Sequence, residues 1–118
     1  MASDVTMWFN PNCSKCRGAR DILAGEDVSC DIVRYLEDAP TRTELERVMG
    51  LLGITDPRAM MRTGEAVYRE LGLADAGADQ LLDAMTAHPV LIERPIVIRG
   101  ERAVIGRPPE RVRELLGP

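Results

Sequence analysis

Cys13 and Cys16 are the residues of this chain best placed to do chemistry. They follow a short apolar run at 5–9 that predicts a strand and a turn at 10–12. A helix is predicted from residue 15, so Cys13 stands at or just before its N-terminus, where unpaired N–H groups and the helix dipole favour a thiolate. A thiolate attacks electrophiles. We expect Cys13 to be exposed, because it lies outside the helix, and it is therefore the predicted nucleophile. Cys16 is a candidate to resolve a mixed disulfide.

An oxyanion bound at Cys13 would need cationic ligands from elsewhere in the chain. Position 19 is alanine, so the chain lacks the Cys-x5-Arg loop of a phosphatase. The candidates are Arg62, Arg94 and Arg107, of which the last two directly precede a proline. A residue before proline is held in an extended conformation, which restricts where its side chain points. Guanidinium groups are always charged and bind oxyanions with a planar, forked geometry.

Two other interpretations of the cysteine pair are a zinc half-site and two unrelated thiols. A structural zinc ion needs about four ligands. Only Cys30 and His88 remain as soft donors, with no second metal-like spacing, so no bound metal is expected. Cys30 is predicted to be a small buried hydrophobe, with a second resolving thiol as the alternative. His88, placed before Pro89, is predicted to pack or cap at a helix end.

The elements that must position these residues begin strand–helix–strand, continue through a helical middle and close strand–strand–helix. Strands are predicted over residues 5–9, 29–36, 95–98 and 103–105. Helices are predicted over 15–24, from Thr41 or Thr43 to Gly53 with a capping box at 43–46, and over 57–61, 65–71, 78–87 and 111–116. The opening implies a parallel pair with a right-handed crossover, and the late hairpin adds antiparallel strands.

This order predicts an α/β fold, a thioredoxin-like mixed sheet flanked by helices, with a helical insertion between strands two and three. At 118 residues, the chain is expected to form a single domain over 1–118. In such folds the start of the third strand faces the cysteine turn. Arg94 and Pro95 stand at that place, and a cis bond before Pro95 is the usual arrangement.

Charge and composition exclude several classes of function. A net charge of −4 and a pI near 5.0 argue against nucleic acid as a partner. No apolar run approaches the roughly 20 residues of a membrane span, and no signal peptide is visible. Three cysteines, two of them close together, do not suggest a secreted disulfide scaffold. A reducing, cytoplasmic location is therefore expected.

Several segments, spread in order over nearly the whole chain, resemble the ArsC family of arsenate reductases, the glutaredoxin-coupled class. The most specific are the Asn-Pro-x-Cys turn and the stretch from His88 to Val97. The segments are Asn10-Pro11-Asn12-Cys13, Tyr35-Leu36-Glu37, Arg58-Ala59-Met60-Met61-Arg62, Tyr68-Arg69-Glu70-Leu71-Gly72-Leu73, His88-Pro89-Val90-Leu91-Ile92-Glu93-Arg94-Pro95-Ile96-Val97 and Gly106-Arg107-Pro108.

The resemblance implies a site and a reaction. In that family the cysteine matching Cys13 attacks arsenate, and the arginines matching Arg62, Arg94 and Arg107 hold the oxyanion. The second thiol is glutathione, and glutaredoxin regenerates the enzyme, with no bound cofactor. The family fold is thioredoxin-like with a helical insertion. We therefore expect an arsenate reductase with arsenate as its small-molecule substrate.

Two departures from the family pattern leave alternatives open. Phe9 stands where members often have histidine, and Cys16 where they commonly have serine. Cys16 allows an internal disulfide with Cys13, with thioredoxin or another dithiol carrier as the donor. The Cys-x-x-Cys spacing is also similar to that of Spx-type redox regulators, which act through RNA polymerase. A general glutaredoxin-type carrier is a further alternative, although it gives the helical insertion and the Arg-Pro pairs no obvious purpose.

Overall fold

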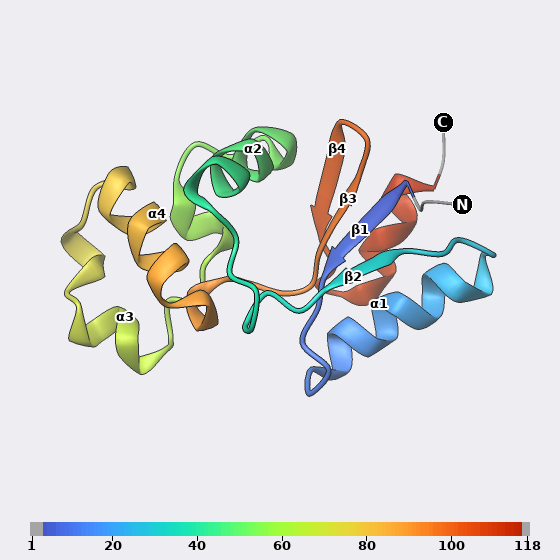
Figure 1. The fold of residues 1–118 in the computed structure, drawn as a ribbon, viewed down its shortest axis with the longest axis horizontal. Coiled ribbons are helices and arrows are strands. Elements are labelled where there is room, and N and C mark those ends of the chain that lie inside the picture. The colour runs from blue at the N-terminus through green and yellow to red at the C-terminus, as the bar shows by residue number, and fades with distance from the viewer. Residues whose placement is uncertain (1–3, 117–118) are drawn as a thin grey trace. The chain divides into compact units, whose positions relative to one another are not determined.

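The computed structural model describes residues 4–116, which fall into two compact units. The first unit runs to Tyr35 and resumes at Arg94, and it contains a sheet of four strands in the order β2-β1-β3-β4 (Figure 1). β1 runs parallel to β2 and antiparallel to β3, and β3 forms a hairpin with β4. The strands are β1 Val5–Trp8, β2 Asp31–Val33, β3 Ile96–Arg99 and β4 Arg102–Ile105. The predicted mixed sheet is confirmed.

Two helices cover one face of this sheet. They are α1 (Ser14–Gly25) and the 3₁₀ helix η4 (Pro109–Leu115), which lie side by side (Figure 1). The alternation along β1 turns Val5 and Met7 toward them, where they join Val97 and Val104 in one core cluster. Each such side chain gains about 1.5–3 kcal/mol when fully buried. This core holds the start of α1 against the end of β1.

Two elements of this unit differ from the sequence prediction. The second strand covers Asp31–Val33 instead of 29–36, because it is an edge strand that pairs only with three residues of β1, 6–8. Its ladder ends where the Phe9 N–H donates to the Val33 carbonyl at 2.8 Å. The closing helix is a 3₁₀ helix that begins at Pro109, because proline fits the first turn of a helix.

The second unit, Leu36–Glu93, is the predicted helical insertion. Its first helix is capped by Thr41, one of the two predicted caps, which forms a capping box with Glu44 in place of the predicted box at 43–46. The Thr41 side chain accepts the Glu44 N–H at 3.1 Å, and the Thr41 N–H donates to the Glu44 carboxylate at 2.9 Å. The helices are α2 Arg42–Leu52, η1 Pro57–Met60, α3 Ala66–Glu70, η2 Leu73–Asp75, α4 Ala78–Ala87 and η3 Pro89–Leu91.

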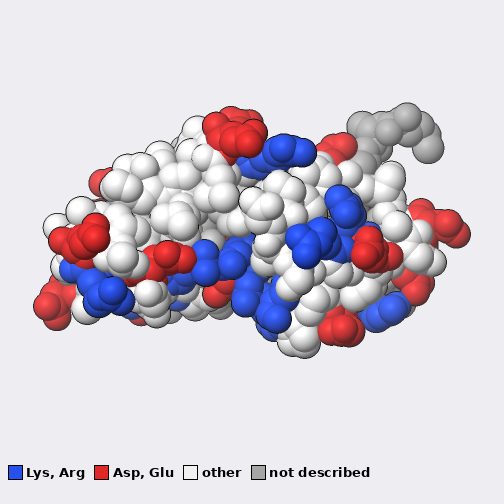
Figure 2. Space-filling model, turned by 90° about the horizontal axis from the view of Figure 1, so that it is seen from below, with Lys and Arg blue, Asp and Glu red and all other residues white. Residues whose placement is uncertain are grey.

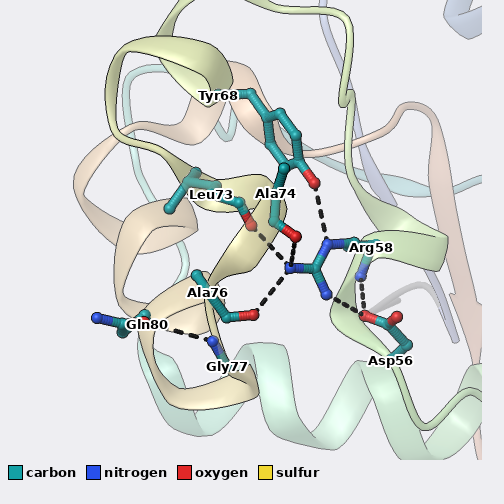
Figure 3. Close-up of polar contacts among 8 residues, drawn as sticks. All are labelled: Asp56, Arg58, Tyr68, Leu73, Ala74, Ala76, Gly77 and Gln80. Atoms are coloured by element: carbon teal, nitrogen blue, oxygen red, sulfur yellow. Dashed lines mark hydrogen bonds and ion pairs between the residues drawn. The ribbon is translucent and has the colours of Figure 1, made fainter.

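Arg58 joins three of these helices (Figure 3). Its Nε donates to the Tyr68 hydroxyl in α3 at 2.9 Å. Its Nη2 donates to the carbonyl oxygens of Leu73, Ala74 and Ala76 at 2.7, 3.0 and 2.8 Å. One guanidinium therefore donates to three carbonyl groups in and just after η2, of which the Leu73 carbonyl also accepts the Ala76 N–H.

Charges of both signs are interspersed on the face drawn in Figure 2. This mixture agrees with the modest net charge of −4. Within residues 4–116, none of the helices is both long and apolar enough to cross a membrane.

Candidate active site

The turn between β1 and α1 is built around Asn10. Its side-chain oxygen accepts the Asn12 N–H at 3.0 Å, and its carbonyl accepts the Cys13 N–H at 3.0 Å. Such side-chain bonds are the reason asparagine favours turns. Cys13 follows with extended dihedral angles (φ −103°, ψ 119°) and occupies the N-cap of α1, as the sequence predicted. The turn thus presents the Cys13 sulfur at the start of the helix.

The pKa of the Cys13 thiol is lowered. Burial is the largest single influence and raises this pKa, but several smaller influences together outweigh it. The N–H and thiol of Cys16, the N–H of Lys15 and the positive charge of Arg94 all favour the thiolate. The expected exposure of Cys13 is wrong, because only 7% of the residue is accessible and it joins the core cluster. Cys13 is thus a largely buried residue whose thiol is shifted toward the thiolate, the form that attacks electrophiles.

Cys16 has the opposite character. It lies on the buried face of α1 with Ala19 and Leu23 and is 0% exposed. The pKa of Cys16 is raised to about 12, chiefly by burial. The hydrogen bond to Cys13 and the Cys13 charge raise it further, whereas the Asn10 N–H and the Arg94 charge lower it. Cys16 therefore stays a thiol at neutral pH and donates its proton toward the Cys13 sulfur.

Arg94 acts on these cysteines, and Arg107 is hydrogen-bonded to Arg94. The charge of Arg94 acts on both sulfurs, and the Arg94–Pro95 bond is cis, as predicted. The Arg107 guanidinium donates from Nη1 to the Arg94 carbonyl at 3.0 Å. The Arg107–Pro108 bond is also cis, a feature not predicted from the sequence. Two predicted anion ligands are thus linked to each other within the first unit.

Gly106, whose role was not predicted from the sequence, lies against Pro95. Its N–H donates to the Pro95 carbonyl at 2.9 Å. A Cβ on Gly106 would lie 2.9 Å from Cγ of Pro95 and 3.4 Å from Cγ1 of Val112. Only glycine lets the end of β4 approach the Pro95 ring this closely. The signal in the sequence was the glycine directly before Arg107.

The third predicted arginine, Arg62, belongs to the second unit. Its N–H donates to the Leu91 carbonyl at 2.7 Å, beside an isolated bridge between Met61 and Ile92. Its Nη1 forms an ion pair with Glu65 at 2.7 Å. The side chain of Arg62 is 30% exposed and that of Glu65 is 27% exposed. An anion at Arg62 would compete with that carboxylate.

Two other basic residues near the cysteine turn, Arg17 and Arg20, have structural partners. Arg17 donates from Nη1 to the Pro11 carbonyl at 2.7 Å, which ties α1 to the turn. Arg20 lies over the Phe9 ring, 5.1 Å from its centre. Such a contact is a cation–π interaction. Phe9 occupies the position where the arsenate reductases that this chain resembles often have histidine. It is a buried packing residue with 3% exposure.

Cys30 lies at the opposite end of β1 from Cys13. The register pairs Thr6 with Asp31, so Cys30 precedes the first paired residue of β2, while Cys13 follows the end of β1. It is half-buried, and burial, aided by Asp31 and opposed by Arg20, raises the pKa of its thiol. This placement argues against Cys30 as a second resolving thiol. Across residues 4–116, no group of three or more His, Cys, Asp or Glu side chains is arranged to hold a metal ion.

Comparisons with known proteins show what this chain is similar to. The model of the ArsC family matches residues 8–115. An arsenate reductase of Neisseria meningitidis serogroup A is 37% identical over 115 residues, covering 96% of this chain and 98% of that protein. An arsenate reductase of Haemophilus influenzae is 42% identical, covering 95% and 98%. The solved structure of an arsenate reductase from Vibrio cholerae superposes with a TM-score of 0.93 at 43% identity, covering 97% and 98%.

Proposed function

This chain belongs to the ArsC family, and we propose that it reduces arsenate to arsenite with Cys13 as the nucleophile. The observation that carries the proposal is the state of that sulfur. Cys13 occupies the N-cap of α1, and the Arg94 charge and nearby N–H groups lower its pKa in spite of burial. The relatives named as arsenate reductases match this chain over nearly its whole length, which supports the choice of substrate.

Arsenate binds with its oxygens on Arg94, Arg107 and the N–H groups that follow Cys13. These donors neutralise the oxyanion and stabilise the charge that develops in the transition state. Arg62 is proposed as a third ligand because of the resemblance to the family. That resemblance also supports the proposal that residues 1–118 form a single domain. A substrate oxygen at Arg62 would replace the Glu65 carboxylate that this arginine now binds.

The chemistry begins when the Cys13 thiolate attacks arsenic. A sulfur–arsenic bond forms, an arsenic–oxygen bond breaks, and the oxygen leaves as water after protonation. Arsenic is still pentavalent in this adduct. Attack of a second thiol on the Cys13 sulfur then breaks the sulfur–arsenic bond, and the electron pair stays with arsenic, which leaves as arsenite. The reducing equivalents come from an external thiol donor, either glutathione with glutaredoxin or thioredoxin, in a reducing compartment such as the cytoplasm.

The test is arsenate-dependent consumption of NADPH by the purified chain. One mixture contains glutathione, glutaredoxin and glutathione reductase, and the other contains thioredoxin and its reductase. Turnover is expected in at least one mixture and is expected to be lost in Cys13→Ser, with Cys30→Ser as the matched control that keeps it. Absence of turnover in both mixtures, or substantial activity in Cys13→Ser, would overturn the proposal.

A redox-sensing regulator of the Spx type is the second candidate function. The observation that favours it is the contact between the two thiols, since the Cys16 thiol donates to the Cys13 sulfur. Oxidation to a disulfide would then alter a protein interface instead of completing a reaction. Binding of the oxidised chain, but not the reduced chain, to an RNA polymerase subunit without arsenate turnover would select this function.

A further inference from the structure

We propose that Cys16 is the resolving thiol of the arsenate reaction, so that one turnover ends in an internal Cys13–Cys16 disulfide. This inference rests on the proposed function and deepens it. It assigns the second attack to a residue of this chain in place of an external thiol. The external donor then acts only afterwards, on a protein disulfide.

The first observation is the position of the two sulfurs. Cys13 is the N-cap of α1, and Cys16 lies three residues further along the first turn. The Cys16 thiol already donates to the Cys13 sulfur. A thiol in contact with the sulfur that carries arsenic needs no diffusion step, and proximity of this kind accelerates a reaction strongly.

The second observation is the difference in access. Cys16 is 0% exposed and packs among Ala19 and Leu23 on the buried face of α1, whereas Cys13 is 7% exposed. A dissolved thiol or oxidant therefore reaches Cys13 before Cys16. Cys16 is shielded from every electrophile except one attached to Cys13, which restricts it to the resolving step.

The third observation is that Cys13 itself suppresses Cys16. After burial, which is the largest influence, the hydrogen bond and negative charge of Cys13 raise the pKa of Cys16, while the Asn10 N–H and the Arg94 charge lower it. Once the Cys13 sulfur is bonded to arsenic, it no longer carries that charge. Two of the influences that keep Cys16 protonated then disappear, and the charge of Arg94 remains. The Arg94 charge and the Asn10 N–H then favour ionisation of Cys16 without opposition from a Cys13 thiolate.

The step balances in atoms and electrons. Cys16 attacks the Cys13 sulfur and its proton passes to an arsenic-bound oxygen, so a sulfur–sulfur bond forms and the sulfur–arsenic bond breaks. Two thiol sulfurs are oxidised to a disulfide, and pentavalent arsenic gains those two electrons and leaves as arsenite. Over the whole sequence, two thiols and arsenate give one disulfide, arsenite and water. No other reductant is needed for the first turnover.

The experiment is a single turnover without any external thiol. The chain is reduced, freed of reductant under nitrogen and mixed with arsenate, and arsenite and remaining thiols are measured. Wild type is expected to form one arsenite per chain and to keep one of its three thiols. Lys15 lies between the two cysteines, so trypsin separates them unless the disulfide joins the fragments.

Two variants separate this inference from the proposed function. Cys30→Ser is expected to behave as wild type, because Cys30 lies at the far end of β1. Cys16→Ser is expected to lose the arsenite burst by roughly tenfold or more and to recover turnover when glutathione and glutaredoxin are supplied.

An undiminished burst in Cys16→Ser would overturn the inference. So would a wild type that turns over only with added thiol, and in both cases the proposed function would stand. Failure of wild type in every donor mixture would overturn both.

Discussion

The Arg107 guanidinium holds the backbone of Arg94, through a 3.0 Å hydrogen bond from Nη1 to the Arg94 carbonyl oxygen. Arg94 is in turn the residue whose charge helps to lower the pKa of Cys13, against the larger opposing influence of burial. Arg107 therefore acts on the nucleophile through Arg94, in addition to its proposed contact with substrate. Loss of Arg107 is expected to disturb both the anion ligands and the sulfur.

Arg107→Ala is accordingly expected to reduce kcat/KM for arsenate by about 10²–10³-fold, the effect typical of losing one oxyanion donor. Arg107→Lys keeps the charge without the forked geometry, so its kcat/KM is expected to lie between those of wild type and Arg107→Ala. The measurement is steady-state arsenate reduction. Arg113→Ala is the control, because Arg113 pairs with Glu26 at the surface and is 54% exposed. Equal losses in Arg107→Ala and Arg113→Ala would show that the effect is one of general charge.

The pH dependence of Cys13 follows from the direction of its pKa. Burial raises this pKa, but the N–H and thiol of Cys16, the N–H of Lys15 and the Arg94 charge together lower it below the ordinary value. A lowered pKa means that the thiolate is already present at lower pH. The alkylation rate of Cys13 by iodoacetamide is therefore expected to rise with pH at a lower midpoint than that of a free cysteine thiol.

Arg94→Met removes one of the influences that favour the thiolate and is expected to move this midpoint upward. Cys16 is expected to stay unlabelled over the same pH range, because burial chiefly raises its pKa to about 12. Peptide mass spectrometry distinguishes the two cysteines. A midpoint for Cys13 at or above that of a free thiol would contradict the argument.

Gly106→Ala is expected to damage the site without touching a charged group. The new Cβ would lie 2.9 Å from Cγ of Pro95, so the Pro95 ring and the Arg94 backbone must shift. Overpacking of this kind costs about 1–3 kcal/mol of stability. Urea unfolding measures the stability, and arsenate turnover measures the displacement of Arg94.

The matched control is Gly50→Ala, in the exposed part of α2, where a Cβ meets nothing within 4 Å. Alanine replaces glycine in a helix with a gain of roughly 0.5–1 kcal/mol. Gly50→Ala is thus expected to stabilise the chain and leave turnover unchanged. If Gly106→Ala also stabilised it, the close approach to Pro95 would not be a constraint.

The predictions from sequence succeeded where a local rule determines the structure. Apolar runs gave the strands β1, β3 and β4, and the helix start after the Asn-Pro turn placed Cys13 at an N-cap. The predictions failed where the structure of a segment depends on the residues that pack or pair with it. The length of β2 depends on the partner it finds in β1, and the cap of α2 depends on which threonine Glu44 can reach.

The candidate site was predictable in its residue types but not in its linkages. Arginines before prolines indicated Arg94 and Arg107, yet no pattern indicated that one holds the backbone of the other. The burial of Cys13 was missed because an N-cap position says nothing of the strand and helix that pack over it. The close approach of Gly106 to Pro95 joins residues 11 apart in sequence, which only the folded hairpin brings together.

Arg58→Ala is expected to loosen the second unit. The Arg58 guanidinium donates to the Leu73, Ala74 and Ala76 carbonyls and to the Tyr68 hydroxyl, and alanine leaves these acceptors without that donor (Figure 3). Partly buried carbonyl groups that lose their donor destabilise a fold more than the bond itself stabilised it. The variant is expected to unfold at lower urea concentration and to exchange the amide hydrogens of 66–77 faster.

Lysine at position 58 separates geometry from charge. A single ammonium group cannot reach the hydroxyl and all three carbonyl oxygens at once, so Arg58→Lys is expected to restore little of the lost stability. Arg69→Ala, which removes an exposed arginine from α3, is expected to change the urea midpoint far less. If Arg58→Lys unfolded at the wild-type midpoint, positive charge alone would hold η2 in place. If Arg69→Ala fell as far as Arg58→Ala, the carbonyl contacts would not be the cause of the loss.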